Sequence, residues 1–220
     1  MKTRILVCIL VISACSFAQT VSRSGEDIVA TLLPDGSVRA FVVPNPSEKA
    51  RVIKQLKEAK HAARGQRTQQ IAFLLAALDV DYQQNRDYLL WVLSGCDVAE
   101  IKNGCNDMTA EYLAYLFEHG HPEILTPLLE AGIKSYNAAG SEFLGGFFSD
   151  LIAKSPDEFL RAVRTFPPAT QGRMCYLAGT ADGGGMAPDN LKKVREELGS
   201  MKDQVARRCL RKIEDANKLQ

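Results

Sequence analysis

Residues 108–166 decide the fold, and they read MTAEYLAYLFEHGHPEILTPLLEAGIKSYNAAGSEFLGGFFSDLIAKSPDEFLRAVRTF. Apolar residues recur in this stretch at spacings i, i+1, i+4 and i+5, which give a helix one broad stripe to bury. Four short helices fit the pattern, and their stripes are Tyr112, Leu113, Leu116 and Phe117; Ile124, Leu125, Leu128 and Leu129; Phe143, Leu144, Phe147, Phe148, Leu151 and Ile152; and Phe159, Leu160, Val163 and Phe166. Helices this short are marginal alone, so the stretch predicts a mainly α-helical fold built of antiparallel helix pairs.

A regular spacing of candidate helix starts suggests a repeat. Candidate N-caps stand at equal intervals of about 34 residues, the size of a helix-hairpin repeat, and they are Asp87, His121, Ser155 and Asp189. Trp91, Leu125 and Phe159 share one offset from these caps, so we expect Trp91 to be buried between paired helices. Asp81 is a rival first cap, and the tetratricopeptide residue pattern is not reproduced. A short α-solenoid and an irregular helical bundle therefore both fit the sequence.

The start of the chain has the composition of a targeting segment. Lys2 and Arg4 precede a short apolar run, which is the order found in a secretory signal. Ser16-Phe17-Ala18 places small residues where signal peptidase cuts, and this makes residues 1–18 a signal peptide.

A lipid anchor is the alternative to simple secretion. Ile12-Ser13-Ala14-Cys15 resembles a bacterial lipobox, and in that case the signal is 1–14 and Cys15 is lipidated. No later stretch is long and apolar enough for a transmembrane helix. Both alternatives predict an exported bacterial protein, periplasmic or secreted, that meets the membrane only through a lipid on Cys15.

The overall charge argues against nucleic-acid binding. The whole chain has 27 basic and 26 acidic residues, for a net charge of +1. Removal of residues 1–18 takes away Lys2 and Arg4, so 25 basic residues remain against 26 acidic ones and the net charge becomes −1. A near-neutral chain lacks the basic surface that binds phosphate backbones.

The mature chain divides into three parts by composition. Residues 19–25 form a polar linker, and residues 26–46 contain two β-rich runs on either side of Pro34-Asp35-Gly36. This pattern predicts a small β-hairpin, which must lean on helices to be stable. Residues 47–220 then form the helical domain.

Four cysteines lie beyond the targeting segment, and an even number in an exported protein suggests disulfides. Cys96 and Cys105 flank a loop with the turn signal Asn103-Gly104, so we expect them to pair. Cys209 continues the apolar stripe of the last helix and Cys175 belongs to a short apolar helix, which predicts a second bridge. Four reduced, buried thiols are the alternative.

The sequence predicts no metal or cofactor site. His119-Gly120-His121 spans a turn and lacks further ligands at metal-binding spacing. Gly183-Gly184-Gly185 follows no strand and precedes no Lys-Ser or Lys-Thr, so it fits a linker better than a phosphate loop. Paired acids at helix starts, such as Asp157 and Glu158, are explained by capping.

One aromatic-rich zone is a candidate binding site. It comprises Tyr112, Tyr115, Phe143 and Phe147, which form either core or a groove for a partner peptide. We therefore expect a non-catalytic, helical-repeat-like module that binds a protein or peptide in the cell envelope or outside the cell. One alternative is a hydrolase assembled around His119 or His121, which requires a pocket where a histidine meets a carboxylate or cysteine. A third is an inhibitor or immunity-type protein that presents the loop from Cys96 to Cys105.

Overall fold

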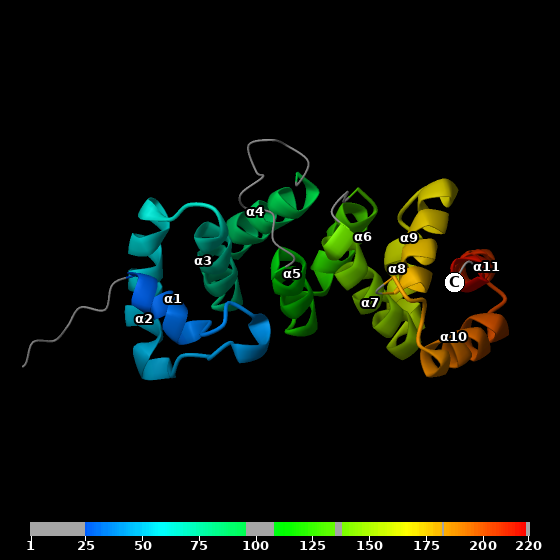
Figure 1. Cartoon of the computed structure of the whole chain (residues 1–220), viewed down its shortest axis with the longest axis horizontal. Helices are drawn as coiled ribbons and strands as arrows, with labels where there is room; N and C mark the ends of the chain where they lie inside the picture. The colour runs from blue at the N-terminus through cyan, green and yellow to red at the C-terminus, as the bar shows by residue number, and fades with distance from the viewer. Residues whose placement is uncertain (1–24, 96–107, 135–137, 182, 219–220) are drawn as a thin grey trace, which may run out of the picture.

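The computed structural model of the chain describes residues 25–95, 108–134, 138–181 and 183–218 (Figure 1). Within these ranges it contains eleven α-helices, two 3-10 helices and no strand, which confirms the mainly helical class. The α-helices are α1 (Gly25–Leu32), α2 (Pro46–Ala62), α3 (Gln66–Ala77), α4 (Tyr82–Ser94), α5 (Met108–Glu118), α6 (Leu125–Lys134), α7 (Ala138–Lys154), α8 (Pro156–Val163), α9 (Pro168–Thr180), α10 (Pro188–Ser200) and α11 (Gln204–Lys218). The 3-10 helices are η1 (Val38–Ala40) and η3 (Pro122–Ile124).

The helices follow one another along an elongated molecule, from α1 and α2 at one end to α11 at the other (Figure 1). α1 packs on α2, α2 on α3, α3 on α4 and α4 on α5. Further along, α7 packs on α8 and α9, and α9 has its most extensive contact with α11. Each helix thus buries its apolar stripe against near neighbours, as short helices require.

The hairpin predicted for residues 26–46 is wrong in the part that the structure describes. Ile28 to Leu32 belong to α1, and residues 38–40 form η1. The buried residues of this segment are Ile28, Val29, Leu32 and Leu33, at the i, i+1, i+4 and i+5 spacing of one helix face. A strand would have sent alternate residues to opposite faces. Pro34-Asp35-Gly36 does turn the chain, because the Asp35 Oδ1 accepts the Ser37 N–H at 2.8 Å and Gly36 has φ +78°.

The regular spacing of helix starts does not hold either. α4 begins after Asp81, which leaves Asp87 inside the helix, and α10 is preceded by Ala187. The expected burial of Trp91 is also wrong, since 59% of its surface is exposed. His121 and Ser155 do precede η3 and α8. The offset of Trp91 from Asp87 therefore predicted the wrong buried face for α4. This helix starts after Asp81, six residues earlier than the repeat alignment assumed.

α3 lies at the centre of the core in the first half of the molecule. Its Phe73 stacks on Tyr112 with ring centroids 4.6 Å apart, and Phe41 meets Phe73 edge-on at 5.5 Å. The side chains of Gln69 and Thr109 are buried among these residues and hydrogen-bond to each other at 2.8 Å.

No helix in the described ranges combines the length and apolar character needed to cross a membrane.

Candidate functional site

A groove of about 440 Å³ lies between η1, α5 and α7. We call it the acidic groove, and it is lined by Val38, Arg39, Glu111, Ala114, Tyr115, Glu118, Glu142, Phe143, Gly146, Phe147 and Asp150. Three of the four aromatic residues singled out in the sequence contribute to it. Its size lies within the range of small-ligand sites, so the groove can hold one or two side chains of a partner.

The floor of the acidic groove is aromatic, and its rings are held from behind by the core. Tyr115 packs edge-on against Phe41 and Phe73, with centroids 5.7 and 5.4 Å away. Phe147 packs edge-on against Phe117 at 5.7 Å. Burial raises the pKa of Tyr115, so its hydroxyl stays neutral at physiological pH. The result is an apolar surface supported by ring packing, because Tyr115 and Phe147 are each held by neighbouring rings, and His119 stacks on Tyr115 at 3.7 Å.

The rim of the groove is strongly negative. Among the described residues, four carboxylates and one cation, Arg39, line it, and the carboxylates are Glu111, Glu118, Glu142 and Asp150. Asp150 accepts a hydrogen bond of 2.8 Å from Asn190. Oε2 of Glu111 is buried, and no hydrogen-bond donor reaches it within the described part of the chain. A buried oxygen without a donor costs on the order of 1–3 kcal/mol, and a ligand donor would relieve this cost only if the Glu111 side chain turned this oxygen toward the groove.

Tyr112 is not a groove residue, and this part of the prediction is wrong. Its side chain is fully buried against Phe73 in the core, although it is only three residues from Tyr115, and its hydroxyl donates to the Gly36 carbonyl at 2.8 Å. Burial is the main reason that the pKa of Tyr112 is raised. The hydrogen bond anchors the turn before η1, and Tyr112 therefore helps to place Val38 and Arg39 in the wall of the groove.

The sequence analysis missed the carboxylates of the groove, although their spacing was visible. Glu111, Tyr115 and Glu118 stand at i, i+4 and i+7, which is one face of a helix. On α7, Glu142, Phe143, Gly146, Phe147 and Asp150 follow the same rule. The stripes of α5 and α7 were interpreted only by their apolar members, so the acidic edge beside each stripe was not considered.

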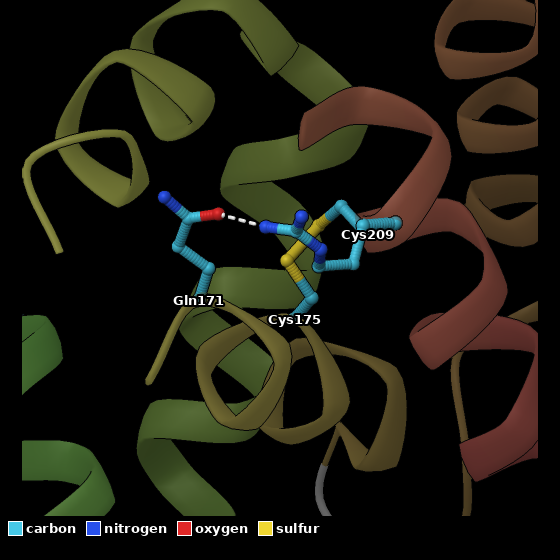
Figure 2. Close-up of a disulfide and its surroundings, with 4 residues drawn as sticks. Gln171, Cys175 and Cys209 are labelled. Carbon is cyan, nitrogen blue, oxygen red and sulfur yellow. Dashed lines mark hydrogen bonds between the residues drawn. A yellow bond between two sulfur atoms is a disulfide. The ribbon is translucent and has the colours of Figure 1, made fainter. Parts of the chain in front are cut away.

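A disulfide joins Cys175 on α9 to Cys209 on α11, with the two Cα atoms 5.0 Å apart (Figure 2). This is the second of the two pairings expected from the sequence. Both cysteines are buried. Beside them, the amide of Gln171 donates to the Phe166 carbonyl at 2.7 Å and accepts from Arg208 at 2.6 Å. The bridge fixes the contact between α9 and α11. The other expected pair, Cys96 with Cys105, and the lipidation candidate Cys15 lie outside the described residues.

His121 lies in a cluster that ties the start of α4 to η3. Its ring stacks on Tyr82 at 4.0 Å, and its nitrogens are 3.6 Å from Asp79 Oδ1 and 3.5 Å from Glu123 Oε1. The Tyr82 hydroxyl donates to Glu123 at 2.7 Å. Burial, together with this hydrogen bond, raises the pKa of Tyr82. Burial alone would raise the pKa of Glu123, but the bond from Tyr82 and nearby positive charge outweigh it and lower the pKa.

His119 and His121 belong to two different side-chain clusters in the described structure. His119 stacks on Tyr115 at 3.7 Å, whereas His121 belongs to the Tyr82 cluster. No set of three His, Cys, Asp or Glu side chains within the described ranges could hold a metal ion. His121 meets two carboxylates, but these contacts alone do not test the hydrolase alternative, which stays a prediction. The loop of the inhibitor alternative lies outside the described residues.

Comparison with family models, curated proteins and solved structures gave no match to this chain. The function is therefore argued from the acidic groove itself.

Proposed function

We propose that the protein is a non-catalytic binding module whose acidic groove takes a basic, apolar segment of a protein or peptide partner. One observation carries the proposal: three aromatic side chains and four carboxylates line one groove of the described structure. The proposal extends to a short α-solenoid-like scaffold, which is supported by helices that pack mainly on others one or two places away in the chain. Scaffolds of this kind commonly offer concave binding surfaces.

Lys and Arg side chains suit this groove better than other residue types. Their methylene stems pack along aromatic rings while the charged head reaches a carboxylate. An arginine placed over Phe147 would bring donors toward the rim carboxylates, and the bond it forms with Glu111 would be charge-assisted. A neighbouring apolar side chain of the partner would fill the space beside Phe143. Such anchors dominate peptide affinities.

We place this binding outside the cytoplasm. The disulfide between Cys175 and Cys209 is of a kind that persists in oxidising compartments. The basic and apolar residues at the start of the chain favour the same location. Both observations support export, and mass spectrometry of Cys15 in the native protein distinguishes a lipid anchor from simple secretion.

Peptide titration tests the proposal. We expect a fluorescein-labelled Lys-Phe-Arg-Leu peptide to bind, and an analogue with Glu in place of Lys and Arg to bind at least about tenfold more weakly. Glu111→Gln and Phe147→Ala should each weaken binding of the basic peptide by about tenfold. Glu196→Gln on α10 is the matched control, since it removes one exposed carboxylate away from the groove. Equal binding of both peptides, or equal loss in the control, would contradict the proposal.

A further inference from the structure

A second groove of about 520 Å³ lies between the end of α6, α9 and α11, and we call it the cationic groove. Its charged residues are Arg173 on α9 with Arg208 and Lys212 on α11, and no acidic residue is among the described residues that line it. The groove is separate from the acidic one and shares no lining residue with it. It therefore presents a concentrated positive charge in a chain that is nearly neutral overall.

The cations of this groove keep most of their donors for a ligand. Arg173 Nη2 donates to the Ile133 carbonyl at 2.7 Å, and Arg208 Nη1 donates to Gln171 at 2.6 Å. Neither guanidinium forms an ion pair with a carboxylate of the described chain. Lys212 lies 3.8 Å from Asp215, one turn along an exposed helix face, which is a weak pair. A guanidinium has five N–H donors, so both arginines can also bind an anion.

Between the cations, the floor of the groove is apolar. Ile133, Ala169 and Leu177 provide this surface from α6 and α9. Two uncharged hydroxyl residues, Tyr176 and Thr180, also line the groove, and the Thr180 hydroxyl already donates to the Leu177 carbonyl at 2.7 Å. Beyond their first turns, the backbone groups of α9 and α11 are bonded within their helices, so this part of the floor offers few partners for the amides of a bound peptide. An occupant without its own amide groups fits better, because none of its polar groups is left unsatisfied.

We propose that the cationic groove binds an anionic amphiphile of the acyl carboxylate class. The carboxylate lies against Arg173, Arg208 and Lys212, where charge-assisted and bidentate hydrogen bonds are available. The acyl chain lies along Ile133, Ala169 and Leu177, and its burial adds roughly 0.8 kcal/mol for each methylene removed from water. This inference is independent of the proposed peptide binding, since it concerns a different groove.

The disulfide gives this groove preformed walls. Cys175 follows Arg173 by two residues and Cys209 comes directly after Arg208, so the bridge holds the two guanidinium-bearing segments side by side (Figure 2). A ligand then spends less binding free energy on ordering the site. The cations of α9 and α11 repel each other, and the covalent link keeps them together before the ligand arrives.

Calorimetric titration of the disulfide-bonded chain with dodecanoate, below its micelle concentration, tests the inference. We expect dodecanoate to bind at least about tenfold more tightly than dodecanol or dodecylammonium. The double variant Arg173→Gln and Lys212→Gln should lose at least about tenfold in affinity for dodecanoate. Ala169→Trp, which fills the exposed apolar floor, should weaken dodecanoate and dodecanol alike. Lys192→Gln on α10 is the matched control for the loss of a surface cation.

Three results would overturn the inference. Dodecanol could bind as tightly as dodecanoate, which would reduce the groove to an unspecific apolar surface. Lys192→Gln could weaken dodecanoate as much as the groove variants do, which would assign the effect to overall charge. An acidic peptide could compete for the groove with higher affinity than dodecanoate, which would assign it to a protein partner. Circular dichroism of each variant shows whether the helices are intact.

Discussion

The acidic and cationic grooves are similar in size, at about 440 and 520 Å³, and opposite in charge. α7 forms one wall of the acidic groove and α9 forms one wall of the cationic groove, and these two helices pack against each other. The net charge of +1 does not reveal either groove, because the negative charges of the acidic groove offset the positive charges of the cationic groove. The charge of each groove is thus a property of local helix faces, which the overall composition does not reveal.

The grooves also differ in what holds their walls. The cationic groove is fixed by the covalent bridge between α9 and α11. The acidic groove depends on ring packing behind its floor and on the hydrogen bond from Tyr112 to Gly36. We therefore expect the cationic groove to resist denaturant and the acidic groove to resist reduction. The following changes test this difference.

Removal of the disulfide should have the largest effect. The bridge joins two cysteines that are 34 residues apart in the sequence. The chain-entropy model assigns such a bridge about 3–4 kcal/mol of unfolding free energy. We expect Cys175→Ala with Cys209→Ala to lose this much in urea unfolding followed by circular dichroism. Dodecanoate affinity should fall more than peptide affinity at low urea. A loss below about 1 kcal/mol would mean that α9 and α11 hold together without the bridge.

A methyl group between α7 and α9 should disturb both grooves at once. A Cβ on Gly145 would overlap the Ala181 carbonyl, which belongs to the backbone and has no room to move aside. We expect Gly145→Ala to cost about 1–3 kcal/mol of unfolding free energy. Gly146→Ala is a sharp control, because a Cβ there meets no atom within 4 Å, and it should stabilise α7 by about 0.5–1 kcal/mol. Equal effects of the two changes would contradict the close packing at Gly145.

Loss of one hydroxyl should affect the acidic groove alone. Tyr112→Phe keeps the ring stacked on Phe73 but leaves the Gly36 carbonyl without its donor. We expect a loss of about 1–2 kcal/mol in unfolding free energy, with weaker peptide binding because η1 is less well placed. Dodecanoate binding should not change. A variant as stable as the parent, with unchanged peptide affinity, would show that η1 does not need this anchor.

The smallest effect should come from acid. Arg164 donates to Asp203 just before α11, and this hydrogen bond holds the pKa of Asp203 below its ordinary value, with the Val205 N–H adding to it. Because the pKa is lower in the folded state, the stabilisation is present above the pKa of the unfolded chain and is lost as pH falls through the folded value.

Both partners are partly exposed, so the contribution of this pair is less than about 1 kcal/mol. Urea unfolding at neutral pH and near pH 3 should show a slightly smaller loss on acidification in Asp203→Asn than in the parent. A larger loss in the variant would reverse the sign of this linkage.

Helix class was predictable from the sequence, and one error came from weighing residue type above spacing. Ile28 and Val29 are β-branched and favour strands, and the turn residues after them strengthened that interpretation. Yet Ile28, Val29, Leu32 and Leu33 have the spacing that identified the other helices. Burial on one helix face overrode the local preference, as tertiary packing commonly does.

The sites were harder to predict, because each depends on which helix faces meet. Tyr112 and Tyr115 are three residues apart on α5, but one is in the core and the other lines the groove. The cationic groove needed the pairing of α9 with α11. The pairing of Cys175 with Cys209 already implied that Arg173 and Arg208 lie close together, so this signal was present in the sequence and went unused. The lengths and tilts of the helices that open each groove depend on tertiary packing, which no local sequence pattern encodes.

The outward position of Trp91 has a spectroscopic consequence. It is the only tryptophan in the chain, 59% of its surface is exposed, and its ring lies 6.1 Å from that of Tyr88 on α4. Its emission in the folded protein already reports contact with water, so unfolding changes the emission wavelength little and acrylamide quenches the native state. Trp91 lines neither groove. A blue shift with protection from the quencher would therefore identify a partner that covers α4, a surface distinct from both grooves.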